Sequence, residues 1–283
     1  MRNMHKIRES SNRSTVGCDG PGKHNILGVL VDAMDLETAV ELIIRAAHDR
    51  RPASIGAVAV HGVMTGALDT NQRYRLNSFD LLLPDGQPVR WALNWLHKTK
   101  LSGRVYGPML TLRVLERAAL EKLPVYLYGS TPEIIGRLQE GLRPRYPDLE
   151  IAGSESSRFR KLSRDEQSAM LRRIKSSGAR LLFVGLGCPR QEVFAYEMRQ
   201  TLPLPVLAVG NAFPILAGTL RQAPAWMQDR GLEWLFRLFQ EPRRLWKRYL
   251  FLNPVYLGLL LLQLLRFPFR HYGVPPNNEV FYG

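Results

Sequence analysis

The chain has 283 residues, of which 45% are hydrophobic, which is enough to bury the core of one large domain. A formal net charge of +14 and a pI of about 10.2 favour a polyanionic partner: nucleic acid, an anionic membrane surface or a phosphorylated substrate. The two cysteines, Cys18 in a polar tail and Cys188, argue against a structural disulfide and for a reducing cytoplasmic compartment.

The first 23 residues are basic and polar. They contain Arg and Lys but no apolar segment, which argues against a secretory signal peptide. They are also rich in Ser, Asn and Gly, so we expect a disordered basic tail over residues 1–23.

After this tail, short apolar strands alternate with amphipathic helices. Asp35 is expected to cap the first helix, and Ser163 with Glu166 has the spacing of a capping box before a later one. The alternation predicts an α/β fold, a Rossmann-like and mostly parallel sheet with helices on both faces. The expected strands are Ile26–Val31, Ile55–Val60, Phe79–Leu83, Val125–Tyr128, Leu149–Ala152, Leu181–Val184 and Val206–Val209.

A single carboxylate follows the third of these strands. Pro84 ends the apolar run because it cannot donate to a sheet ladder, and Asp85 and Gly86 come next. Asp85 is therefore expected at the carboxyl end of a strand, where open α/β sheets bind ligands. The alternative is a plain turn, since Pro-Asp-Gly is strong turn chemistry.

Two more strands end in glycine turns that open helices. Gly129 precedes a hydroxyl cap at Thr131 and a proline at the first helical position, and Gly187 precedes Pro189. Such helix starts present free N–H groups to an anion, which makes Gly129 and Gly187 candidates for substrate binding. Ordinary helix capping is the alternative. The sequence has no G-x-G-x-x-G, no P-loop lysine and no zinc-spaced Cys/His cluster, which argues against a nucleotide-dependent oxidoreductase.

The composition changes after residue 223. Aromatic residues interleave with Arg and Lys, and then Leu250–Leu265 is almost wholly apolar apart from Asn253, Pro254 and Gln263. This run is shorter than the roughly 20 residues of a spanning helix, and Asn253-Pro254 is expected to break it. It is typical of an interfacial membrane segment. The alternative is a helix pair packed within the molecule or in a homo-oligomer. Nucleic acid is disfavoured because no reading motif is present.

Several blocks in sequence order carry a resemblance to a known family. They are Leu83–Gly86, Arg104–Pro108, Gly185–Glu192, Gly231–Leu238 and Glu241–Leu245. Together they resemble the WecG/TagA/CpsF family of bacterial glycosyltransferases (glycosyltransferase family 26), from about Ile26 to about Asn253. The resemblance implies inverting transfer of a sugar from a UDP-sugar to a polyprenyl-diphosphate-linked glycan, without a metal or other cofactor, in surface or exopolysaccharide biosynthesis. The transferred sugars among such relatives are N-acetylmannosamine, its uronic acid, glucose and glucuronic acid.

The resemblance also implies roles for individual residues and a location. Asp85 falls on the position of the proposed general base. Arg104, Gly107 and Gln191 fall in blocks implicated in substrate binding. The core would span residues 24–222, and residues 223–283 would form an appendage that closes over the site at the inner face of the cytoplasmic membrane. Its basic residues, expected to stabilise the leaving UDP, are Arg237, Arg244 and Lys247.

A few positions depart from the family pattern. Ala57 and Ala59 stand where Thr and Asn are usual, Pro214 stands after Phe213 in place of Asp, and Met109 stands where Asp often follows. The base is kept, but two polar side chains are lost from the expected pocket. The alternative function is therefore a non-catalytic relative that binds lipid-linked glycan or scaffolds a polysaccharide assembly complex.

Overall fold

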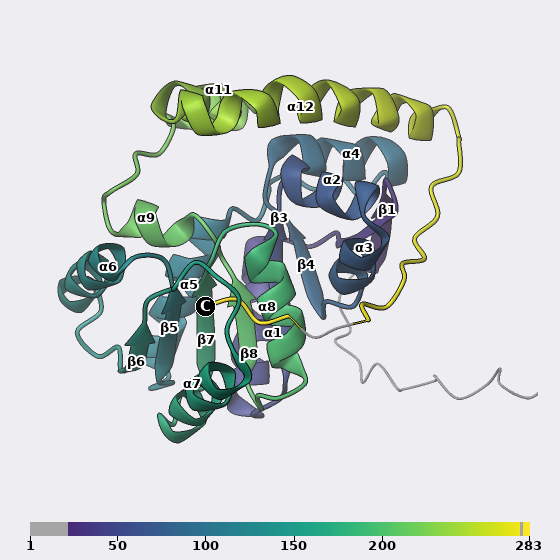
Figure 1. Cartoon of the computed structure of the whole chain (residues 1–283). Helices are drawn as coiled ribbons and strands as arrows, with labels where there is room; N and C mark the ends of the chain where they lie inside the picture. The colour runs from purple at the N-terminus through teal and green to yellow at the C-terminus, as the bar shows by residue number, and fades with distance from the viewer. Residues whose placement is uncertain (1–21, 278–279) are drawn as a thin grey trace, which may run out of the picture.

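The computed structural model describes residues 22–277 and 280–283, so the predicted tail over 1–23 lies almost entirely outside the described residues. At its centre is a six-stranded sheet with strand order β4-β3-β8-β7-β5-β6 (Figure 1). All pairings in this sheet are parallel, which confirms the predicted fold class. The strands are β3 (Ala53–Val58), β4 (Leu81–Pro84), β5 (Val125–Gly129), β6 (Ile151–Glu155), β7 (Leu181–Gly185) and β8 (Pro205–Ala208).

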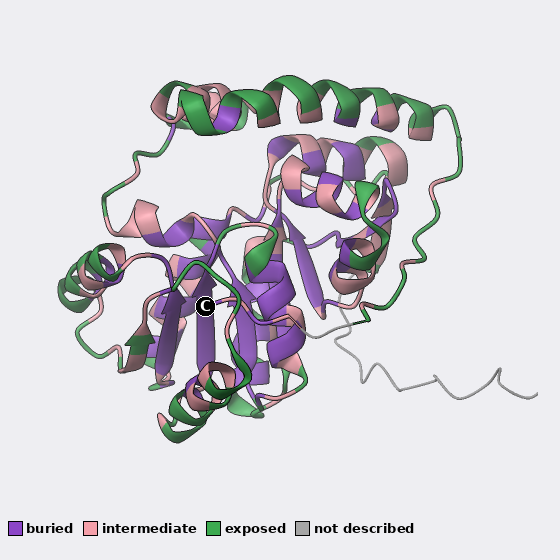
Figure 2. Cartoon of the chain, viewed as in Figure 1, coloured by how far each residue is buried: buried purple, intermediate pink, exposed green. Residues whose placement is uncertain are grey.

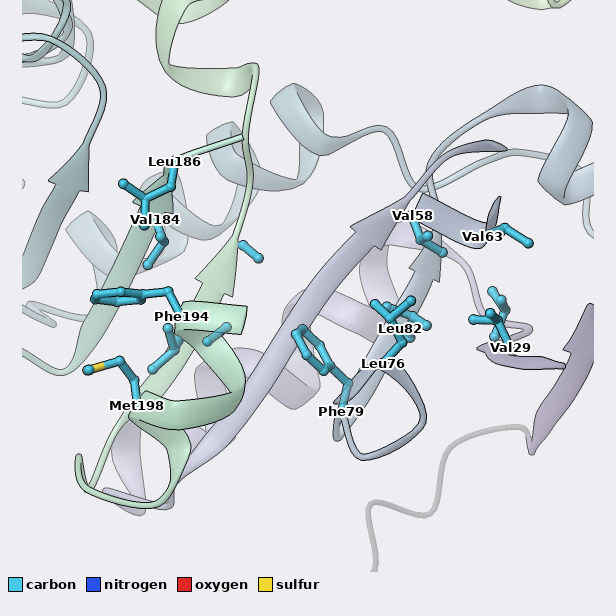
Figure 3. Close-up of a cluster of buried hydrophobic side chains, with 14 of the residues drawn as sticks. Val29, Val58, Val63, Leu76, Phe79, Leu82, Val184, Leu186, Phe194 and Met198 are labelled. Carbon is cyan, nitrogen blue, oxygen red and sulfur yellow. The ribbon is translucent and has the colours of Figure 1, made fainter. Parts of the chain in front are cut away.

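Helices cover both faces of the sheet because successive strand residues point to opposite sides. In β7, Leu182 and Val184 belong to one core cluster, and Leu181 and Phe183 belong to the other. Figure 3 shows part of the first cluster, where side chains of α8 lie against the sheet. The helices that bury residues in this cluster are α2 (Val60–Leu68), α3 (Thr70–Asn77), α4 (Gln87–His97), α7 (Arg164–Ser176), α8 (Arg190–Arg199) and α12 (Pro242–Leu264). Those of the second cluster are α1 (Leu36–His48), α5 (Gly107–Leu120), α6 (Pro132–Arg145) and α9 (Ala212–Leu216).

The predicted helix caps are confirmed. The Asp35 side chain accepts a hydrogen bond from a backbone N–H in the first turn of α1. Ser163 and Glu166 form both hydrogen bonds of the capping box that begins α7. Thr131 caps α6, with Pro132 in the first turn. These bonds satisfy N–H groups that a helix start leaves free, so local sequence alone sets where these helices begin.

Some strand predictions need correction. The single strand expected at Ile26–Val31 is a hairpin of β1 (Lys23–Ile26) and β2 (Val29–Asp32). The chain reverses at Leu27 and Gly28, whose φ angles of 53° and 90° suit a two-residue type I′ turn. Apolar residues flank this turn on both sides without a polar interruption, so the apolar pattern does not reveal it.

Several strand boundaries also differ from the prediction. The strand expected at Ile55–Val60 is β3, which ends at Val58, and Val60 begins α2. Pro84, expected to end the strand before it, is the last residue of β4 and pairs with Val58. Because β4 lies at one edge of the six-stranded sheet, the missing N–H costs little there. The strand expected at Leu149–Ala152 is β6, which begins later, at Ile151.

After α9, the described part of the chain forms the helices α10 (Ala225–Asp229), α11 (Glu233–Gln240) and α12 (Pro242–Leu264). The predicted break at Asn253-Pro254 is wrong, since α12 runs through both residues. Pro254 lies on the exposed side of the helix, where the carbonyl that loses its partner can be hydrated. Helix α12 lies over α2 and α4 (Figure 1). Across residues 22–277 and 280–283, no helix combines the length and hydropathy needed to span a bilayer.

The C-terminal helices are much less buried than the sheet (Figure 2). Helices α10 and α11 contain no fully buried residue, and α12 buries Leu245, Tyr256 and Leu260. The large apolar side chains exposed on this segment are Trp226, Trp234, Phe239, Trp246, Leu250, Phe251, Val255, Leu257, Leu261, Leu262, Leu264, Leu265 and Phe267.

Candidate active site

Asp85 is fixed at the carboxyl end of β4. Its backbone N–H donates to the carbonyl of Val58 in β3 at 3.1 Å. Its side-chain Oδ1 accepts from the backbone N–H of Gly107, at the start of α5, at 3.1 Å. The second oxygen, Oδ2, accepts no hydrogen bond from any described residue. The loop is therefore ordered by backbone contacts while one carboxylate oxygen stays available to a ligand.

The surroundings of Asp85 favour its protonated form. Burial raises the pKa of Asp85 to about 6, and the carboxylate of Glu233 adds to the rise. The guanidinium groups of Arg104 and Arg237 and the N–H of Gly107 oppose this rise in pKa. A carboxylate with a pKa near the working pH can take a proton from a hydroxyl in a transition state, which is the property required of a general base.

A polar cavity of about 170 Å³ lies on one side of Asp85. Gly187 and Gln191 line it, and the Gln191 side chain holds the loop after β7: its Oε1 accepts from the N–H of Gly187 at 3.1 Å. Its Nε2 donates to Glu192 Oε1 at 3.0 Å. Gly210, with φ of 51°, passes so close that a Cβ there would lie 2.9 Å from Gln191 Oε1. Loops after several neighbouring strands therefore form one wall.

The polar cavity carries more positive than negative side chains. Arg237 donates to the side-chain oxygen of Asn211 at 2.8 and 3.0 Å, with the amide oriented as these donors require. Arg244 forms an ion pair with Glu241. This surplus of guanidinium groups suits a ligand with several phosphate oxygens. The cations that line the cavity are Arg221, Arg237, Arg244 and Arg248, and the acids are Asp85, Glu192 and Glu233.

An apolar cavity of about 420 Å³ lies on the other side of Asp85, between α4 and α12. The rings of Trp91 and Trp95 stack along its α4 wall with centroids 6.2 Å apart. The hydroxyl of Tyr256 donates to the Pro88 carbonyl at 3.1 Å and joins α12 to α4. Trp95 and Leu257 line the cavity and are also 56% and 59% exposed, so it opens onto the apolar outer surface.

The two cavities meet at Asp85. Both are bounded by this carboxylate, and the residues that line both are Ala59, Asp85, Glu233, Arg237 and Arg248. A ligand in the polar cavity and a ligand in the apolar cavity would therefore both reach the same side chain.

Arg104 connects the core to the C-terminal helices. Its Nη2 lies 2.7 Å from Glu233 Oε2 of α11 and donates to Gln228 Oε1 of α10 at 3.0 Å. Its guanidinium stacks over the ring of Tyr106 at 4.3 Å from the centroid. Arg104 also lines the apolar cavity. Its bonds to Gln228 and Glu233 hold α10 and α11 over Asp85.

Most predicted site residues line these cavities, Gly107 lines neither but donates to Asp85, and two others lie elsewhere. Gly129 ends β5 opposite Gly185 of β7, at the same edge of the sheet as Asp85. Its φ is 111°, and a Cβ there would lie 2.8 Å from the Gly185 backbone, so close packing of two strand ends requires glycine. Lys247 is exposed, with Nζ 5.5 Å from the Trp246 ring. Neither Gly129 nor Lys247 is among the described residues that line the two cavities.

Sequence reasoning missed several charged residues of the site, and two of them, Glu233 and Arg248, line both cavities. Arg248 follows Leu245 by three residues and precedes Leu252 by four, which is the spacing of one helical face and was a usable signal. Glu233 lies inside a block that was noted only for its resemblance. Its closeness to Asp85 arises from the docking of α11, which no local pattern reports.

Other reactive side chains near the site are buried. Burial and the nearby Arg248 lower the pKa of His61 to about 4, so the imidazole is neutral at physiological pH. Burial raises the pKa of Cys188, which keeps it a thiol. Within the described ranges, no cluster of three or more His, Cys, Asp or Glu side chains could hold a metal ion.

The sequence was compared with models of known protein families. A model described as the glycosyl transferase WecG/TagA/CpsF family matches residues 24–270. This range covers most of the chain and includes every residue that lines either cavity, from Ala57 to Leu260.

Proposed function

The chain belongs to the glycosyl transferase WecG/TagA/CpsF family, and from this premise we propose that it transfers a sugar from a UDP-sugar to a polyprenyl-diphosphate-linked glycan. The product would serve the synthesis of a surface polysaccharide or exopolysaccharide. The observation that carries the proposal is a pair of cavities of opposite character that share Asp85. The polar cavity suits the nucleotide diphosphate of a donor, and the apolar cavity suits the prenyl chain of an acceptor.

In the proposed reaction, Asp85 removes the proton from the attacking hydroxyl of the acceptor glycan. That oxygen forms a bond to the anomeric carbon of the donor while the bond from this carbon to the phosphate oxygen breaks. A single displacement of this kind inverts the anomeric centre and needs only one carboxylate as base. The proton ends on Asp85 Oδ2, the oxygen that accepts no hydrogen bond from a described residue.

The leaving UDP carries new negative charge on its diphosphate. Arg237 and Arg244 face the polar cavity from α11 and α12, where they would stabilise this charge. In this proposal guanidinium groups supply the stabilisation that a divalent cation supplies in other transferases, so the reaction would be metal-independent.

The outer surface of the C-terminal segment supports peripheral binding at the inner face of the cytoplasmic membrane. We treat residues 24–222 as the catalytic core and residues 223–283 as the membrane-associating appendage. Exposed apolar side chains along α12 would enter the lipid interface, and Arg243, Arg266 and Arg270 would contact anionic headgroups. The apolar cavity opens at Leu257 on the same helix, so a lipid-linked acceptor would enter from the bilayer side.

The test is a screen of UDP-sugars against polyprenyl-diphosphate mono- and oligosaccharides, with product mass as the readout. The donors are UDP-linked N-acetylmannosamine, its uronic acid, glucose and glucuronic acid. We expect one donor to add one sugar residue and to release UDP. Binding of UDP and of prenyl diphosphate without transfer from any donor would contradict the proposal.

One observation favours a second candidate, a non-catalytic relative that holds lipid-linked glycan in an assembly complex. Ala57 and Ala59 line the polar cavity, so methyl groups occupy positions where the family usually has Thr and Asn. UDP release from a UDP-sugar with a membrane fraction as acceptor distinguishes the candidates. The binding protein would release none above the rate without acceptor.

A further inference from the structure

Helix α12 presents a graded row of side chains to the two cavities. Arg244 lines the polar cavity, Arg248 lines both, and Leu252, Tyr256 and Leu260 line the apolar one. These residues are four apart, so they follow one helical face in steps of roughly 6 Å. Arg248 therefore marks the level at which the lining changes from charged to apolar.

Arg248 has no hydrogen-bonded or ion-paired partner in the described part of the chain, although its guanidinium lies over the ring of Tyr249, 5.9 Å from the centroid. Its buried Nε is therefore unpaired. The Nε of Arg237 is also buried and unpaired, but both of its Nη groups donate to Asn211, and Arg244 is paired with Glu241. A buried donor left unpaired costs free energy that a bound acceptor would recover.

The groups around Arg248 do not neutralise it. Burial lowers the pKa of Arg248, and the charges of Arg237 and Arg244 lower it further, against the opposing influence of Tyr249 and Cys188. The nearby Glu192 accepts from Gln191 and forms no ion pair with Arg248 among the described residues. An anion at this position would therefore be attracted by several guanidinium groups and would have one of them free to bond.

We propose that Arg248 binds the diphosphate of the lipid-linked acceptor, an inference that rests on the proposed function. A prenyl diphosphate whose chain fills the apolar cavity has its anionic group where the chain ends, which is the level of Arg248. The glycan attached to that diphosphate then extends toward Asp85, which also lines both cavities. Arg237 and Arg244 remain for the diphosphate of the donor.

Lys247 provides a matched control for Arg248. R248A and K247A each remove one positive charge from α12, so they weaken the attraction of this helix for an anionic surface alike. Of the two residues, Arg248 lines the cavities and Lys247 is exposed outside them. A difference in ligand binding between the two variants is therefore due to the position of Arg248 in the cavities and not to the net charge of the helix.

The experiment measures equilibrium binding of farnesyl diphosphate and, separately, of UDP to the full chain. We expect R248A to weaken farnesyl diphosphate binding roughly 10- to 100-fold, because a charge-assisted hydrogen bond is lost. We expect K247A to bind farnesyl diphosphate like the wild type. UDP affinity should stay within about twofold in both variants, which also shows that the cavities are folded. If R248A does not fold, R248K, which keeps the charge but not the planar fork, should give an intermediate loss.

Three results would overturn the inference: no farnesyl diphosphate binding by the wild type, equal losses in R248A and K247A, or a loss in R248A confined to UDP. The last would assign Arg248 to the donor. Failure of the proposed function is distinguishable, because it would appear as wild-type protein that binds both ligands but transfers no sugar. Sugar transfer by the wild type together with unchanged farnesyl diphosphate binding by R248A would reject the inference alone.

Discussion

The sheet and the C-terminal helices contribute to the same site by different physical means. Every strand from β3 to β8 except β6 is buried along nearly its whole length. Asp85 donates its backbone N–H to the Val58 carbonyl and accepts a hydrogen bond from the backbone N–H of Gly107. The C-terminal helices bury few residues and reach the site through single polar contacts such as Arg104 to Glu233 and Arg237 to Asn211. The proposed base is therefore fixed by the core, whereas Arg237, which is proposed to stabilise the leaving diphosphate, lies on a helix with no fully buried residue.

Under the proposed function this difference would matter, because the lipid-linked acceptor would have to enter the site from a bilayer. Helices α10 and α11 contain no fully buried residue, so they can separate from the core at a lower free-energy cost than any strand, whereas α12 buries Tyr256 and Leu260 in the core. Separation would also remove Glu233 from Asp85 and Arg237 from the polar cavity. The core therefore holds Asp85 in place by itself, whereas the charged side chains of α11 and α12 reach the site only when these helices are docked.

The largest effect is expected for the base. Asp85→Asn should reduce turnover roughly 10²- to 10⁴-fold, because an amide cannot take the hydroxyl proton. The pKa of Asp85 is raised to about 6, so above pH 6 the fold holds a buried charge that costs stability. The variant should therefore be no less stable than the wild type at pH 7 to 8 by thermal melting.

Asp148→Asn is the control for Asp85→Asn. Asp148 is an exposed acid after α6, and its change removes the same charge without approaching either cavity. It should retain wild-type turnover. Turnover of Asp85→Asn within about twofold of this control would remove Asp85 from the mechanism.

The next effect concerns the outer surface of α12. Leu261→Ser should lower binding to anionic vesicles about fivefold at high salt, because roughly 1 kcal/mol of apolar burial is lost. Leu120→Ser, on α5, removes a side chain that is 73% exposed, against 58% for Leu261, and should not change binding. Vesicle co-sedimentation measures both. Equal losses of vesicle binding in the two variants would show that any exposed leucine contributes to binding, whether or not it lies on α12.

The smallest effect is a shift in pH dependence. Asp85 acts when deprotonated, so kcat/KM should fall as the pH drops through about 6. Glu233 raises the pKa of Asp85, and its partner Arg104 lowers it. Glu233→Gln removes the first influence and frees Arg104 from its ion pair, so the acid limb of the profile should move to lower pH.

Asp229→Asn is the control for Glu233→Gln, since it removes an exposed charge from the neighbouring helix α10. Its kcat/KM profile should match that of the wild type between pH 5 and 8. A limb that stays in place or moves to higher pH in Glu233→Gln would show that the docked α11 does not tune the base.

The two regions also differ in how far sequence predicts them. Strands buried on both faces have continuous apolar runs, and helix starts have capping side chains. These local patterns predicted the sheet and the starts of α1, α6 and α7. The hairpin turn at Leu27-Gly28 escaped because apolar residues flank it without a break. The sequence did not predict that α12 continues through Pro254. Whether a proline interrupts a helix depends on its exposure, and exposure depends on tertiary packing.

The site residues are likewise predictable only where the signal is local. Asp85 could be proposed from a strand end and a turn, which are local features. The choice between Lys247 and Arg248 depends on the rotation of α12 against the core, and the local signal for it is that Arg248 shares a helical face with Leu245 and Leu252. Gly129 had the sequence of an anion-binding turn, yet its conformation is explained by the close approach of Gly185.

The central claim is that two substrates occupy two cavities that meet at Asp85. The most direct test is equilibrium binding of farnesyl diphosphate to the full chain in the absence and presence of saturating UDP, with no donor sugar and therefore no turnover. The account predicts simultaneous binding, with a farnesyl diphosphate Kd that UDP weakens by no more than about twofold. Competition between UDP and farnesyl diphosphate for one site would contradict it.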